Sequence, residues 1–226
     1  MVPRFLRTLL LAFPLAFAVP SPASPDHWAK DIDAFTAADA ARPPPAHAVL
    51  FIGSSSIVKW QSLAEDFPFT PVINRGFGGS ELADSVFYAD RIAIPYRPRA
   101  IVLYAGDNDI AAGKSPEQVA ADFVAFRAKI HAALPGTPIF YLSIKYSNSR
   151  LKFKDAMARA NALIAADCAA NPHCTFVDVN SAMLGADGNP RPELFQSDQL
   201  HMLPAGYAIW TRILAPLLKQ TVDNTR

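Results

Sequence analysis

The chain has 226 residues, of which 51% are hydrophobic and 18% are charged. Its 21 Lys and Arg residues nearly balance its 20 Asp and Glu residues, which leaves a formal net charge of +1. This length is sufficient to bury a core of ordinary size. The charge balance argues against a nucleic-acid partner, which would require an excess of cations.

The first 23 residues have the pattern of a targeting segment. Arg4 and Arg7 precede an apolar stretch at 8–19, and small residues that suit a signal peptidase extend to Ala23. A membrane anchor is the alternative, but the stretch is short for a bilayer and Pro14 interrupts it. We therefore expect residues 1–23 to be a signal peptide, a periplasmic or secreted mature protein, and no stable membrane anchor.

Export affects what the two cysteines are expected to do. Cys168 and Cys174 flank a turn-like segment, and in an oxidising compartment they are expected to form a disulfide bond. A redox or metal role is the alternative, with His173 as a third ligand. Two thiols and one histidine in a single loop make a poor tetrahedral site, so the disulfide is favoured.

Apolar runs of strand length alternate with helical patterns along the rest of the chain. Residues 24–45 are predicted to form an N-terminal helix, with its pattern at 28–41, and a Pro-rich segment; 46–226 are predicted to form one domain. The strands are predicted at 48–52, 71–74, 100–104, 138–143 and 175–179. Further helices are predicted at 57–66, after Ser80, from a capping box at Ser115, at 149–170 and after Pro204. Nearly continuous apolar strands between helices predict five parallel strands covered on both faces, in an α/β sandwich.

Polar or glycine-rich segments follow the predicted strands. The first strand leads into Gly53-Ser54-Ser55-Ser56, the second into 74–79 and the third into Gly106-Asp107-Asn108-Asp109, while the loop after the fifth leads to Asp198 and His201. The fourth strand delivers Lys145 and Ser147. Because ligands bind beyond the carboxyl ends of parallel strands, we expect these segments to share one edge of the sheet.

An acid three residues before a histidine can orient the imidazole, and the imidazole can then deprotonate a serine. In their order along the chain, the four segments resemble the motif blocks of the SGNH hydrolase superfamily, also called GDSL esterases and lipases. The blocks correspond to Gly53-Ser54-Ser55, Gly79, Gly106-Asp107-Asn108-Asp109 and Asp198-x-x-His201. The resemblance covers nearly the whole chain after the leader. It implies a three-layer sandwich of flavodoxin-like topology.

The same resemblance implies a serine esterase that needs no cofactor or metal. Ser55 would be the nucleophile, His201 the general base and Asp198 the acid that orients it. The backbone N–H groups of Ser55 and Gly79, together with the side-chain amide of Asn108, would form the oxyanion hole. A serine hydroxyl needs such a base, and the developing oxyanion needs preorganised donors.

Several assignments have alternatives. Ser54 stands where the family usually has Asp, which leaves three adjacent serines; alignment with the family favours Ser55, and Ser56 is expected to cap the next helix. Asp178 is a rival partner for His201. The pair formed by Asp107 and Asp109 is interpreted as charges at a helix start.

The substrate is expected to be a small-molecule, lipid or carbohydrate ester with a small or exposed acyl group of the acetyl type, because no long insertion would form a lid. Four aromatic residues are interpreted as core residues, with a position flanking an acyl group as the alternative for the second of them: Trp60, Phe77, Tyr104 and Tyr207. A non-catalytic flavodoxin-like module for a small ligand is the alternative function. A nucleotide-binding protein is disfavoured because no glycine loop carries a lysine. The sequence does not indicate an oligomeric state.

Overall fold

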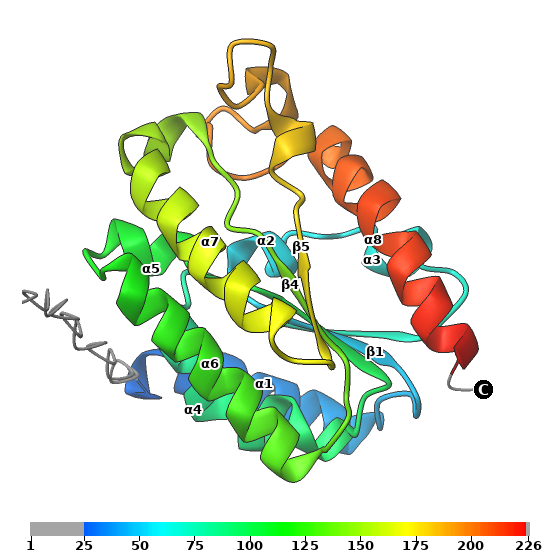
Figure 1. Cartoon of the computed structure of the whole chain (residues 1–226). Helices are drawn as coiled ribbons and strands as arrows, with labels where there is room; N and C mark the ends of the chain where they lie inside the picture. Colours follow the sequence, from blue (N-terminus) through cyan, green and yellow to red (C-terminus); the bar gives the residue numbers. More distant parts are fainter. Residues whose placement is uncertain (1–24, 225–226) are drawn as a thin grey trace, which may run out of the picture.

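The computed structural model describes residues 25–224 and contains a five-stranded parallel sheet with helices on both faces (Figure 1). The strands are β1 (Val49–Gly53), β2 (Val72–Gly76), β3 (Ala100–Tyr104), β4 (Ile139–Leu142) and β5 (Cys174–Val177). Their order is β2-β1-β3-β4-β5, and every neighbouring pair is parallel. This confirms the predicted three-layer sandwich. The predicted signal peptide lies outside the described residues.

The strand order creates a reversal next to β1. After β1 the chain adds β2 on one side and then crosses back to add β3 on the other side. The connections that leave β1 and β3 therefore run in opposite directions. In an open parallel sheet, a crevice forms at such a point beyond the carboxyl ends of the strands. The topology therefore places the segments that follow β1 and β3 at the mouth of one crevice.

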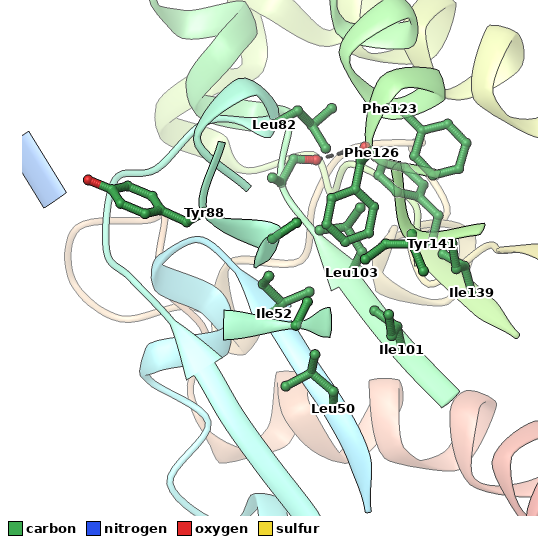
Figure 2. Close-up of a cluster of buried hydrophobic side chains, with 14 of the residues drawn as sticks. Leu50, Ile52, Leu82, Tyr88, Ile101, Leu103, Phe123, Phe126, Ile139 and Tyr141 are labelled. Carbon is green, nitrogen blue, oxygen red and sulfur yellow. Dashed lines mark hydrogen bonds between the residues drawn. The ribbon is translucent and has the colours of Figure 1, made fainter. Parts of the chain in front are cut away.

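The two faces of the sheet bury separate clusters because successive strand side chains point in opposite directions. One cluster lies beneath α1 (Pro25–Ala41), α4 (Leu82–Ile92), α6 (Pro116–Ala133) and α7 (Lys154–Ala169). Figure 2 shows part of it, including Leu50, Ile101 and Tyr141. The Tyr141 hydroxyl donates to the Ala105 carbonyl at 2.7 Å. The other cluster lies beneath α8 (Pro204–Asn224).

Trp60 explains why the helix predicted at 57–66 is broken. The structure has two short helices there, α2 (Ser55–Val58) and α3 (Leu63–Asp66). The Trp60 ring, 1% exposed, lies between them and contacts Phe51 and Trp210. Its indole N–H donates to Asp66 at 2.5 Å. Burial of this ring in the core thus interrupts a pattern that would otherwise continue as one helix.

The helix predicted at 149–170 is also divided. A 3₁₀ helix, η2 (Asn148–Phe153), precedes α7, and Arg150 departs from helical geometry with φ −117° and ψ 18°.

The capping box predicted at the start of α6 is confirmed: the Ser115 hydroxyl accepts from the Gln118 N–H, and the Gln118 side chain accepts from the Ser115 N–H.

A disulfide bond joins Cys168, near the end of α7, to Cys174, the first residue of β5. This confirms the predicted pairing and ties α7 to the edge strand through a loop of five intervening residues.

Within residues 25–224, no helix combines the length and the apolar character that a bilayer crossing requires.

Candidate active site

The turn after β1 exposes one of the three adjacent serines. Gly53 has φ +133°, and a Cβ there would stand 1.9 Å from the Tyr104 carbonyl oxygen, so only glycine fits. Ser54 and Ser56 are each 1% exposed, whereas Ser55 is half-buried. Ser55 is also the first residue of α2, which places Ser56 inside the helix. The expectation that Ser56 caps this helix is therefore wrong, and Ser55 is the accessible hydroxyl.

A histidine from the far end of the chain meets this hydroxyl. The His201 Nε2 atom lies 3.0 Å from the Ser55 Oγ atom, and its Nδ1 atom lies 2.6 Å from Asp198 Oδ2. The Asp198 Oδ1 atom accepts the backbone N–H groups of Leu200 and His201 at 2.9 Å and 3.0 Å. The sequence-predicted Ser55, His201 and Asp198 are thus joined in one hydrogen-bonded chain.

The loop that carries the acid and the histidine is closed by its own backbone. Phe195 and Met202 form a bridge across its base, and the Gln196 N–H donates to the His201 carbonyl at 2.7 Å. The hydrogen bond from His201 is the main reason that the pKa of Asp198 lies well below its usual range. A carboxylate that remains charged is suited to hold a histidine in one orientation.

Asp178, the rival partner for His201, is engaged elsewhere. Its Oδ1 atom accepts the N–H groups of Asn180 and Ser181, and its Oδ2 atom accepts the Ser181 hydroxyl at 2.5 Å. Asp178 therefore stabilises the turn after β5, whereas the carboxylate that His201 Nδ1 faces is that of Asp198.

Two groups predicted for the oxyanion hole lie on segments that contact each other. Asn108 belongs to α5 (Asp107–Ala111), which follows β3, and its side-chain N–H donates to the Ser80 carbonyl at 3.0 Å. The Asp109 carboxylate accepts the Leu82 N–H at 3.1 Å. Consecutive residues of α5 thereby hold the segment that contains Gly79, whose φ of +85° suits glycine. In residues 25–224, neither the Gly79 N–H nor the Ser55 N–H has an acceptor within the protein.

The two aspartates of α5 lie in its first turn, as interpreted from the sequence, but both are buried in ion pairs. Asp107 lies 3.3 Å from Lys145 Nζ and 3.1 Å from Arg150 Nη1. Burial favours a higher pKa for Asp107, but these two cations outweigh it and lower the pKa. Burial raises the pKa of Asp109 to about 7, although Lys114 Nζ lies 3.3 Å away.

Lys145 and Ser147 lie near the expected edge of the sheet, but each is only 1% exposed. The Lys145 ammonium donates to the Tyr104 hydroxyl at 3.1 Å, and burial lowers its pKa. Lys145 therefore lies at the expected edge, where it contacts Asp107 of the segment after β3, but both side chains lie beneath the surface. Among the described residues, no group of three or more His, Cys, Asp or Glu side chains is placed to bind a metal ion.

The aromatic side chain beside Gly79 is Trp28 rather than Phe77. Phe77 is 1% exposed and belongs to the core, which confirms its interpretation as a core residue over the alternative that it flanks an acyl group. The half-buried Trp28 of α1 packs on Phe77 with 5.8 Å between ring centroids. Its Cη2 atom lies 3.2 Å from the position that a Cβ on Gly79 would occupy. Sequence reasoning missed this contact because the only signal at Trp28 was its helical spacing.

The sequence matches one family of known proteins. Residues 53–209 match the family model described as the GDSL-like lipase/acylhydrolase family. A comparison with curated protein sequences finds no match.

Solved structures share the fold at low sequence identity. A candidate acylhydrolase from Bacteroides fragilis superposes with a TM-score of 0.72 at 21% identity, covering 88% of this chain and 97% of its own. A GDSL-like lipase from Bacteroides thetaiotaomicron gives 0.71 at 20% identity, with 87% and 98% covered. A variant of an acetyl-xylooligosaccharide esterase from Geobacillus gives 0.62 at 17% identity, with 76% and 94% covered.

Proposed function

The chain belongs to the GDSL-like lipase/acylhydrolase family, and we propose that it is an exported esterase that removes small acyl groups, of the acetyl type, through Ser55. The observation that carries this proposal is the hydrogen-bonded chain from Ser55 to Asp198. Its two side-chain links, of 3.0 Å and 2.6 Å, pass through His201. This is the arrangement of nucleophile, base and orienting acid that acyl transfer requires.

In the proposed reaction, Ser55 Oγ attacks the ester carbonyl carbon while His201 Nε2 takes the hydroxyl proton. Asp198 accepts the Nδ1–H and stabilises the imidazolium that forms. The carbonyl oxygen becomes an oxyanion that accepts hydrogen bonds from the Ser55 and Gly79 N–H groups and the Asn108 amide.

Collapse of the tetrahedral intermediate breaks the bond to the alcohol oxygen, and His201 gives that oxygen its proton. The acyl group remains on Ser55 as an ester. Water then attacks the acyl carbon, His201 accepts a water proton, and collapse returns that proton to Ser55 Oγ as the carboxylic acid leaves.

The preference for a small acyl group is supported by the position of Trp28. Its ring lies beside Gly79, one of the proposed oxyanion donors, and so occupies space next to the point where an acyl carbonyl would bind. An acetyl group needs little room there, whereas a long chain would have to pass the ring. Export is supported by the pattern of residues 1–23 and by the disulfide between Cys168 and Cys174.

A series of 4-nitrophenyl esters from acetyl to palmitoyl, run beside acetylated sugars, tests the proposal. We expect kcat/KM to be highest for acetyl or another short acyl group and to fall as the chain lengthens. Hydrolysis of none of these esters by the folded protein would contradict the esterase assignment, and a maximum at palmitoyl would contradict only the small-acyl preference.

Replacing Trp28 with alanine tests the origin of that preference. Removal of the ring opens space beside Gly79. The ratio of kcat/KM for octanoyl over acetyl esters is therefore expected to rise by about 10-fold, the lower end of the discrimination that one methylene supplies in an apolar pocket. Phe35→Ala is the control, because Phe35 lies on the same helix and packs against the core with Arg75 over its ring. An equal ratio in the wild type and the Trp28 variant would exclude a role for this ring in acyl selection.

A further inference from the structure

Arg150 contacts the oxygen of the Asn108 side-chain amide. Its Nη2 atom donates to Asn108 Oδ1 at 2.9 Å, while Asn108 Nδ2 donates to the Ser80 carbonyl at 3.0 Å. Arg150 comes from η2, 42 residues further along the chain, and its side chain is 18% exposed. The two ends of the Asn108 amide are thus held by two different segments.

These two contacts leave one donor of the amide available. An asparagine NH₂ group has two N–H bonds, and the Ser80 carbonyl accepts one of them. An amide rotated by 180° would turn Oδ1 toward the Ser80 carbonyl and NH₂ toward the guanidinium, so both contacts would become repulsive. The two contacts therefore fix one orientation of the Asn108 amide, with Oδ1 toward Arg150 and Nδ2 toward Ser80. In this orientation the second N–H of Nδ2 has no partner in these two contacts and is available to a substrate oxygen.

Arg150 is itself fixed by a buried anion. Its Nη1 atom lies 3.1 Å from Asp107 Oδ2, and the same oxygen lies 3.3 Å from Lys145 Nζ. The Lys145 ammonium in turn donates a hydrogen bond to the Tyr104 hydroxyl. A guanidinium is planar and carries several donors in a fixed geometry, so it can bind Asp107 and Asn108 together, which an ammonium cannot do equally well. Arg150, which makes both contacts, is also the residue at which the backbone of η2 departs from helical geometry.

The charge of this cluster has the sign that suits an oxyanion. Lys145 and Arg150 contribute two positive charges and Asp107 contributes one negative charge. A hydrogen bond from a charged donor to the amide oxygen draws electron density toward that oxygen and makes the remaining N–H a stronger donor.

We propose that Arg150 is a positioning residue, which orients and polarises the Asn108 amide for the oxyanion that forms on the substrate. This inference rests on the proposed esterase function, in which Asn108 is an oxyanion donor. Arg150 acts through Asn108 and does not itself touch the reacting atoms.

Replacing Arg150 with methionine keeps an unbranched apolar stem and removes the guanidinium. We expect kcat for acetyl esters to fall by about 10- to 100-fold with KM within about threefold, a smaller loss than the 10²- to 10³-fold expected for removing an oxyanion donor altogether by Asn108→Ala. Arg150→Lys should recover only part of the activity. Lys152→Met is the matched control, since Lys152 is an exposed cation on the same 3₁₀ helix and lies over the Phe153 ring.

The double variant decides whether Arg150 acts through Asn108. If it does, Arg150→Met should cause little further loss in the Asn108→Ala background, because the group that it positions is already absent. Equal fold-losses in the two backgrounds, or an unchanged kcat in the single variant, would overturn the proposal.

A second measurement does not depend on activity. The side-chain ¹⁵NH₂ resonances of Asn108 are expected to be those of a rigid amide in the wild type and in Lys152→Met, and those of a mobile amide in Arg150→Met. An equally rigid Asn108 amide in Arg150→Met would overturn the positioning role. If the wild type hydrolyses no ester but the Asn108 amide still becomes mobile in Arg150→Met, the result would count against the esterase proposal alone. The positioning contact between Arg150 and Asn108 would remain supported.

Discussion

Replacing Ser55 with alanine is expected to lower kcat for an acetyl ester by about 10⁴-fold or more, because the variant has no oxygen that can form the acyl-enzyme. The hydrolysis of 4-nitrophenyl acetate, corrected for spontaneous hydrolysis, measures the loss. The fold should be unaffected, since the half-buried Ser55 hydroxyl contacts His201 and no core residue depends on it. Circular dichroism and the melting temperature check this.

Ser54 supplies the matched control for that experiment. It is the adjacent residue and is 1% exposed, and its hydroxyl has no hydrogen-bond partner within the described part of the chain. Ser54→Ala should therefore retain kcat within a few-fold. Full activity in Ser55→Ala together with its loss in Ser54→Ala would show that Ser54, and not Ser55, is the nucleophile.

Replacing Asp198 with asparagine is expected to lower kcat by about 10⁴-fold with little change in the fold. Asparagine removes the negative charge that faces His201 Nδ1 at 2.6 Å, so the imidazolium formed during acylation loses its partner and the ring can adopt the wrong tautomer. The wild-type pKa of Asp198 is held well below its usual range, so this carboxylate is ionised across neutral pH. The loss is therefore expected both near pH 6 and near pH 9, since neither condition protonates the wild-type group.

Asp178→Asn is the control for the second variant. This carboxylate follows β5 and binds the turn at Asn180 and Ser181, without contact to His201. We expect Asp178→Asn to lower thermal stability modestly and to keep kcat within a few-fold. A comparable loss of kcat in both variants would remove the distinction between the two acids.

The strands were predictable because both faces of the sheet are covered. The apolar runs at 48–52 and 100–104 coincide within one residue with β1 and β3, whose side chains are all buried. The helices were less predictable where a tertiary contact interrupts a local pattern. α2 ends two residues before Trp60, whose ring is buried in the core. Only the pair formed by Asp107 and Asp109 indicated the start of α5, because a helix of five residues has too little periodicity to detect.

The sequence alone determined the class of fold, the disulfide pairing, and the segments that carry Ser55, Gly79, Asn108, Asp198 and His201, because apolar periodicity and short motifs are local properties. Only the tertiary structure decided how those segments meet. It buried Ser54 and Ser56 while leaving Ser55 accessible, and it directed Asp178 into a turn. The contacts of Trp28 with Gly79 and of Arg150 with Asn108 join residues 51 and 42 positions apart. Such contacts depend on how helices pack across strand ends, and no local pattern in the chain encodes that packing.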